Sequence, residues 1–443
     1  MKTSFGAVAA SALALALAAA GVQAHAAPAP KPVKSMTVTT DNETPVLYDD
    51  EEGGNASGDD PAIWVDPVNS ANSLVIVTAK GGGLYVYDLG SKELQHLPAT
   101  PLPNDGRFNN VDIAYGVKVG GQTLDLAVVS DRYNDSIRFF AIDPAGARAG
   151  QPLREVTAAD QAYLFVRNAA ELEDEHTAYG LAVWQPRNGN EAYAVVTQEG
   201  RTNLAVARIV GNADGTVGYE VERTITMPGQ FVLPDGTTWI PCEEPGVEPQ
   251  FEGVTVDNRS GILYAAQEDV GLWRIDLENR NKKPELIDKV TDFGVHDRFD
   301  PETEACEPIG EDKGYGGNIT ADAEGVDLYY GPGTTGYIIL SSQGSDEFFV
   351  YERQGRNKLV GSFKVDGING ADAIHGSDGL AVTNRPVGQY TEGLLVTHDE
   401  PESGPGVDDE RDPTNFSYVS WGDIARALDL KINTTAKNDP RFR

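Results

Sequence analysis

Short runs of alternating apolar and polar residues recur along most of the chain, and six of them open with the same kind of phrase. Each phrase has a polar leader, usually acidic, followed by small and β-branched residues. The leaders are 50 to 73 residues apart, which is the spacing of blades in a β-propeller rather than of a solenoid repeat. The six phrases begin at Asp60, Asn110, Tyr179, Glu252, Glu324 and Asp378.

A second apolar run follows each phrase and ends in polar residues, and a third, amphipathic run follows the second. Their alternation and their enrichment in Val, Ile and Tyr are typical of β-strands. In an antiparallel pair, the start of the first strand lies beside the end of the second. We therefore expect the leaders and the polar ends to share one mouth of a central channel. These polar ends include Lys80, Arg132, Glu199, Arg201, Glu268, Gln343, His398 and Glu400.

The last repeat has no room for a fourth strand, because Trp421 is followed by a helical turn at 423–428 and a polar tail. A strand-like run, Met36–Thr40, lies near the other end of the chain. We predict that this N-terminal strand completes the last blade and closes the ring, which removes two exposed sheet edges. The alternative is a disordered extension. The predicted fold class is all-β: one six-bladed β-propeller domain over residues 27–430, with a tail at 431–443.

The first 26 residues have the pattern of a signal peptide. They hold one Lys, a long Ala/Leu run and the small-residue cleavage pattern Ala24-His25-Ala26. This pattern predicts a protein that is secreted or periplasmic. No other stretch is long and apolar enough to span a bilayer, so no membrane partner is expected.

The chain contains two cysteines, Cys242 and Cys306, which lie in neighbouring Pro-rich acidic inserts. Export favours a disulfide bond between these inserts. Two free thiols are the alternative.

The formal net charge of −33 argues against nucleic acid and anionic membrane surfaces as partners, because both require basic patches. At the predicted mouth, carboxylates far outnumber the basic residues Lys80, Arg132 and Arg201. Oxygen ligands without a His or Cys cluster indicate hard cations, and a large number of ligands favours Ca²⁺ over Mg²⁺. Any single carboxylate could instead be a solvated loop residue, but the repeated register aligns the whole set.

Several motifs resemble those of the β-propeller phytases, and the similarity runs from about Met36 to Trp421. The resemblance implies a calcium-dependent enzyme that binds several Ca²⁺ ions and hydrolyses phytate, myo-inositol hexakisphosphate, as its calcium complex. The motifs include Asp59-Asp60-Pro61-Ala62-Ile63-Trp64-Val65, Asn109-Asn110-Val111-Asp112, Ser341-Ser342-Gln343-Gly344 and Ser377-Asp378-Gly379-Leu380.

The resemblance also assigns roles to single residues. The catalytic set is Lys80, Arg132, Asp60, Glu252 and Asp378, and Lys80 and Arg132 also bind substrate phosphate. Arg201 could replace a lysine that family members often carry in the third blade, where this chain has Gln198-Glu199-Gly200. The implied metal ligands are Asp60, Tyr179, Glu252, Glu268, Asp322, Glu324, Gln343 and Asp378.

The implied chemistry agrees with the residue types. A phosphomonoester dianion approaches an acidic mouth only if bound cations invert the local potential. The metal would activate a water molecule for in-line attack, so no covalent nucleophile is required. Lys80 and Arg132 would neutralise phosphate oxygens.

Two other interpretations stay open. One is another secreted calcium-binding six-bladed propeller hydrolase, such as a lactonase, although a neutral substrate poorly explains Lys80 and Arg132. The other is a non-catalytic extracellular propeller. We expect a monomer with a small-molecule substrate.

Overall fold

The computed structural model describes residues 33–49, 56–99, 105–147, 150–187, 191–303, 305–404 and 406–435. The described residues from Lys34 onward belong to one compact unit. The predicted signal peptide lies outside the described residues. Within the described ranges, no helix is long and apolar enough to cross a membrane.

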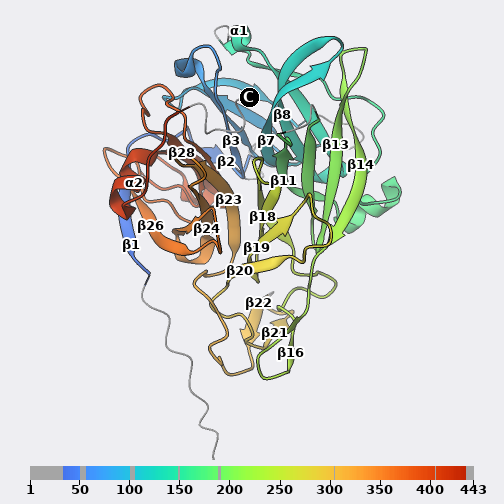
Figure 1. Cartoon of the computed structure of the whole chain (residues 1–443), viewed down its shortest axis with the longest axis vertical. Coiled ribbons are helices and arrows are strands. Elements are labelled where there is room, and N and C mark those ends of the chain that lie inside the picture. Colours follow the sequence, from blue (N-terminus) through green and yellow to red (C-terminus); the bar gives the residue numbers. More distant parts are fainter. Residues whose placement is uncertain are drawn as a thin grey trace, which may run out of the picture. The chain divides into compact units, whose positions relative to one another are not determined.

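Six sheets form the blades of a β-propeller, which confirms the predicted fold class (Figure 1). The first three blades are β3 (Pro61–Trp64), β4 (Leu74–Thr78), β5 (Leu84–Tyr87) and β6 (Glu93–Leu97); β7 (Phe108–Val119), β8 (Gln122–Asp131), β9 (Ser136–Ile142) and β10 (Leu153–Glu155); and β11 (Ala178–Trp184), β12 (Tyr193–Gln198), β13 (Asn203–Gly211) and β14 (Val217–Thr226).

The fourth and fifth blades are β17 (Phe251–Asp257), β18 (Ile262–Gln267), β19 (Gly271–Asp276) and β20 (Glu285–Lys289); and β23 (Ala323–Tyr330), β24 (Gly336–Ser342), β25 (Glu347–Glu352), β26 (Leu359–Gly367) and β1 (Ser35–Thr40). The sixth is β27 (Leu380–Thr383), β28 (Leu394–Asp399), β29 (Pro413–Ser420) and β2 (Leu47–Tyr48). Helices are short: α1 (Pro144–Ala147) and α2 (Trp421–Leu428), which covers the predicted helical turn.

The inner strands of the sheets are buried between neighbouring blades, and every residue of β17 and β24, for example, is buried. One hydrophobic cluster joins Val128 on the second blade to Val196 on the third, and another joins Ile339 on the fifth to Trp421 after the sixth. Both faces of these inner strands are therefore covered, whereas the outer strands β6 and β14 expose part of their residues.

The glycine that follows several leaders allows the inner strands of adjacent blades to approach closely. A Cβ atom on Gly180 would lie 1.8 Å from the carbonyl oxygen of Glu252, and one on Gly253 would lie 2.2 Å from that of Glu324. The recurring leader–Gly phrase therefore combines a polar residue with a position that only glycine can occupy at this distance.

The N-terminal segment closes the ring, but one detail of the prediction is wrong. Strand β2 pairs with β29 and supplies the fourth strand of the last blade. The predicted closing strand, Met36–Thr40, lies in β1, which instead pairs in parallel with β26 and extends the fifth blade. The chain then continues along β29, where the amide of Thr44 donates to the carbonyl of Phe416.

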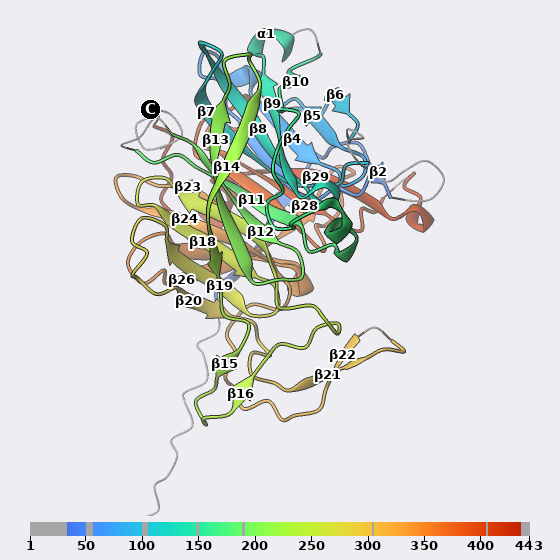
Figure 2. The same cartoon turned by 90° about the vertical axis from the view of Figure 1, so that its right-hand side faces the viewer.

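A lobe outside the blades is formed by two hairpins, β15 (Phe231–Val232) with β16 (Thr238–Trp239) and β21 (Asp297–Asp300) with β22 (Ala305–Pro308) (Figure 2). The predicted Cys242–Cys306 disulfide is present, with the two Cα atoms 6.0 Å apart.

Part of the predicted tail packs on the fifth blade. Asn433 is buried, and its side-chain amide donates to the carbonyl of Tyr330. Residues 436–443 lie outside the described part of the chain.

Candidate active site

A cavity of about 520 Å³ opens at the mouth of the propeller, where the leaders and the polar strand ends meet. Its volume lies in the range typical of small-molecule sites. Most of the predicted site residues line it. The lining residues are Asp59, Lys80, Arg132, Tyr179, Glu252, Glu268, Asp322, Glu324, Gln343, Gly376, Asp378, Glu400 and Pro401.

Three buried glutamates form the acidic centre of this cavity. Glu252 is the second residue of β17, Glu268 directly follows β18, and Glu324 is the second residue of β23. One carboxylate oxygen from each lies within 4.8 Å of the others. Burial, followed by repulsion from neighbouring carboxylates, raises the pKa of Glu268 and of Glu324 well above its ordinary value.

This acidic centre is suited to bind a cation, because some of its carboxylate oxygens lack hydrogen-bond partners among the described residues. Oε1 of Glu268 and Oε2 of Glu324 are buried and have no hydrogen-bond partner in the described residues. Buried polar atoms rarely lack a hydrogen-bond partner, because without one nothing offsets the free-energy cost of removing them from water. Carboxylate oxygens that converge in this way are the ligands that Ca²⁺ prefers.

Lys80 lies between two of the carboxylates that line the cavity. Its Nζ is 3.8 Å from Oδ2 of Asp59 and 3.5 Å from Oδ2 of Asp378. Burial lowers the pKa of Lys80, but Asp59 and Asp378 outweigh this effect, so its pKa is raised and the side chain stays charged. Its φ of 44° turns the chain sharply at the end of β4, before the three glycines.

Arg132 begins a short 3₁₀ turn (Arg132–Asn134) after β8, and polar groups surround it. Its Nε donates to Oε2 of Glu199 over 2.9 Å, and its Nη2 donates to Oε1 of the same carboxylate. Its Nη1 donates to Oδ1 of Asn109 over 3.1 Å. The ring of Tyr179 lies 4.8 Å from the guanidinium carbon, a cation–π distance.

Asn109 and Tyr179 connect the basic side of the cavity to the acidic one. The Asn109 amide donates to Oε1 of Glu252 over 2.8 Å, and the Tyr179 hydroxyl donates to Oε2 of Glu252. The Asn109-Asn110 motif was visible in the sequence, but nothing local indicated that Asn109 would join Arg132 to Glu252.

Gln343 and Asp322 lie on the fifth-blade side of the cavity. Nε2 of Gln343 donates to Oδ1 of Asp378 over 2.8 Å. Burial and the nearby Asp269 and Glu252 raise the pKa of Asp322 to about 7.

Two of the predicted residues lie elsewhere. Asp60 lines the narrow channel below the mouth, where its Oδ2 accepts a hydrogen bond from the amide of Val111, while the preceding Asp59 lines the cavity. Arg201 does not line the cavity, and its Nη1 donates to the carbonyls of Gly200 and Gly246.

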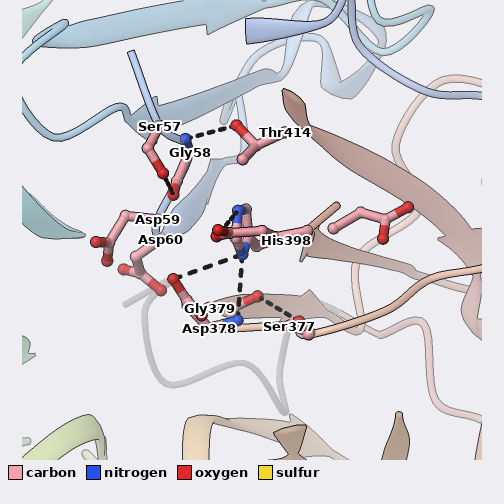
Figure 3. Close-up of polar contacts among 12 residues, drawn as sticks. Ser57, Gly58, Asp59, Asp60, Ser377, Asp378, Gly379, His398 and Thr414 are labelled. Carbon is pink, nitrogen blue, oxygen red and sulfur yellow. Dashed lines mark hydrogen bonds and ion pairs between the residues drawn. The ribbon is translucent and has the colours of Figure 1, made fainter. Parts of the chain in front are cut away.

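His398 is fully buried and does not line the cavity; Figure 3 shows its contact with Asp378. Its Nδ1 accepts a hydrogen bond from the amide of Asp378 over 3.2 Å. Burial, with Lys80 nearby, lowers its pKa well below the ordinary value, so the ring is neutral. His398 therefore supports the backbone of Asp378.

A second acidic group lies at the sixth blade, away from this cavity. Carboxylate oxygens of Glu43, Asp372 and Glu402 lie within 4.8 Å of one another, and they join the N-terminal segment to two loops. Burial and the neighbouring Asp372 raise the pKa of Glu43 to about 7 and that of Glu402 to about 8. Sequence patterns gave no sign of this group, because its members come from unrelated positions.

The fold and the cavity together define a propeller whose mouth combines clustered carboxylates with two basic side chains. A family model described as Phytase matches residues 2–231 and 300–442 of the chain. The chain therefore belongs to the phytase family.

The chain is also similar to individual proteins, a curated relative and a solved structure. A 3-phytase from Bacillus subtilis is 29% identical over 409 residues, which cover 91% of this chain and 88% of that protein. The crystal structure of a calcium-binding protein, regucalcin, from Agrobacterium tumefaciens matches with a TM-score of 0.43 and 10% identity, over 90% of this chain and 97% of that one.

Proposed function

We propose that this protein hydrolyses phytate to lower inositol phosphates and inorganic phosphate, with Ca²⁺ bound at the mouth of the propeller. The observation that carries the proposal is the cavity itself, which Lys80 and Arg132 line together with carboxylates. Two of the carboxylate oxygens have no hydrogen-bond partner among the described residues. Membership of the phytase family and the 3-phytase relative support the same reaction.

The residues that would hold calcium are the carboxylates that converge on the cavity. Glu252, Glu268 and Glu324 would share one ion, and Asp322 and Asp378, which also line the cavity, offer further oxygens. Bound calcium would offset their charge, contact phosphate oxygens and activate water.

The protein's own side chains would position the phosphoryl group. Lys80 and Arg132 would stabilise the negative charge that develops on the phosphate oxygens during transfer. The Tyr179 hydroxyl would keep the Glu252 carboxylate in place, and the neutral His398 would fix the backbone of Asp378.

The predicted signal peptide and the disulfide bond support an exported protein, secreted or periplasmic. The strongly negative charge supports a protein that acts on a cation complex rather than on nucleic acid or membranes.

The test is product identification by ion chromatography after incubation with phytate or with a neutral lactone of similar size, both in millimolar Ca²⁺. We expect stepwise release of phosphate from phytate and no lactone opening. Lactone hydrolysis without phosphate release would instead assign the chain to another class of propeller hydrolase.

A further inference from the structure

The side chain of Arg132 is held on three sides by residues from two blades. The Glu199 carboxylate accepts hydrogen bonds from Nε and Nη2, and the side-chain amide oxygen of Asn109 accepts one from Nη1. The Tyr179 ring covers one face of the guanidinium group. Asn109 lies on the second blade with Arg132, whereas Tyr179 and Glu199 belong to the third.

The hydrogen count leaves Arg132 capable of binding an anion. A guanidinium group has five N–H bonds, and three of them have acceptors among the described residues. One hydrogen on Nη1 and one on Nη2 therefore remain. Arg132 lines the cavity, whereas Glu199 does not, so Glu199 holds the arginine from behind the cavity wall.

Glu199 is itself fixed at a rigid place. It follows β12 in the turn before β13, where its amide donates to the carbonyl of Thr177 over 2.9 Å. The next amide, that of Gly200, donates to Oε1 of Gln250 over 2.7 Å. The side chains of Arg132 and Glu199 are 16% and 18% exposed, so water competes weakly for their pairing.

We propose that Glu199 is a positioning residue that orients Arg132 so that its two remaining N–H groups point at a phosphate oxygen of the substrate. This inference rests on the proposed function and deepens it. The third-blade turn thus supplies an anion that fixes the second-blade arginine, rather than a further cation for substrate. A bidentate carboxylate–arginine pair holds the plane of the guanidinium, which a single hydrogen bond does not.

The proposal predicts a specific pattern in a double-mutant cycle of Glu199→Gln and Arg132→Ala. If Glu199 acts only through Arg132, Glu199→Gln should lower kcat for phytate about tenfold, with a smaller change in KM, because one charged hydrogen-bonding acceptor is lost. In the Arg132→Ala background, the same substitution should change kcat by less than about twofold.

A matched control is available on the same blade. Arg138 on β9 donates through Nε and Nη2 to Oε1 of Glu155 on β10, and neither residue lines the cavity. Glu155→Gln likewise removes a carboxylate charge that is paired with an arginine, but outside the cavity, and it should leave both kcat and KM at the wild-type values.

Two results would overturn the proposal. Multiplicative losses from Glu199→Gln and Arg132→Ala would show that Glu199 acts independently of Arg132. A lower KM with an unchanged kcat in Glu199→Gln would show that Glu199 competes with substrate for Arg132 instead of orienting it. If the glutamine variant does not fold, Glu199→Asp, which retains the charge but is one methylene shorter, is tested in the same cycle with the same criteria.

Binding of inorganic phosphate keeps this test separate from the proposed function. Calorimetric titration of phosphate into the calcium-loaded protein should show weaker binding in Glu199→Gln than in the wild type, and Glu199→Gln should cause no further weakening when it is added to Arg132→Ala. If phosphate binding shows this coupling but the wild-type protein releases no phosphate from phytate, the substrate assignment is rejected and the role of Glu199 is retained. A pattern without this coupling would reject the role of Glu199 whatever the substrate.

Discussion

The glutamate cluster makes a strong prediction about charge in the metal-free protein, which Glu324→Gln tests. Glu324 is 4% exposed, its Oε2 has no partner among the described residues, and it lies within 4.8 Å of ligand oxygens of Glu252 and Glu268. Two unit charges at that distance repel by about 3 kcal/mol at an effective dielectric constant of 20. The substitution removes two such pairs and keeps the shape of the side chain.

The full repulsion is an upper limit, because burial raises the pKa of Glu268 and of Glu324 and thereby favours their uncharged forms. We therefore expect a gain of about 1–3 kcal/mol for metal-free Glu324→Gln at pH 8, which corresponds to an increase of a few degrees in melting temperature. The stabilisation on adding Ca²⁺ should be smaller than in the wild type, because one ligand is lost.

Thermal unfolding of chelator-stripped protein, with and without Ca²⁺, measures both quantities. Glu285→Gln is the control, since the Glu285 side chain is 58% exposed on β20 and should change neither. A lower melting temperature for stripped Glu324→Gln, together with a calcium-dependent increase equal to that of the wild type, would refute the reasoning that this cluster is a repulsive cation site.

Three further predictions follow from the site and the lobe. Arg132→Ala should reduce phytate turnover roughly 10²–10³-fold with little change in melting temperature, and wild-type turnover would remove Arg132 from the site. The pKa of Asp322 is raised to about 7 and that of Glu402 to about 8, so the folded metal-free protein binds more protons than the unfolded chain. Its free energy of unfolding, measured with denaturant, should therefore fall as the pH rises from about 4 to about 8. A free energy of unfolding that rises over this range would contradict the prediction. Replacing Cys242 and Cys306 by Ser removes a disulfide bond between positions 64 residues apart, which should lower the free energy of unfolding by about 4 kcal/mol in the chain-entropy model. Proteolysis within the lobe should become faster. An unchanged rate of proteolysis would show that the disulfide does not stabilise the lobe.

The sequence predicted the acidic centre because its geometry follows from local pattern. Glu252 and Glu324 lead inner strands, and Glu268 ends a second strand, so pairing within each blade places all three at one mouth. Fixing the blade register was therefore enough to bring together residues that are far apart in the chain.

The partners of these residues were harder to predict, because they depend on side-chain directions rather than on strand order. Asp59 and Asp60 are adjacent, and the repeat does not determine which one faces the cavity. The Arg132–Glu199 and Asn109–Glu252 contacts each cross between blades. Strand order alone does not show that the carboxylate paired with Arg132 is that of Glu199.

The closing strand was misplaced for a related reason. The alternating pattern of Met36–Thr40 suits any exposed sheet edge, and the edge it joins is that of β26. The strand that completes the last blade, Leu47–Tyr48, has only two residues, which is too short to give a periodic signal.

The central claim is that calcium held by the mouth carboxylates makes phytate hydrolysis possible. Its most direct test is the initial rate of phosphate release from phytate by chelator-stripped protein as free Ca²⁺ is raised from zero to millimolar. We predict no release without Ca²⁺, saturable recovery on its addition, and a midpoint shifted to higher Ca²⁺ in Glu324→Gln. Stripped protein that releases phosphate at the calcium-loaded rate would contradict the claim.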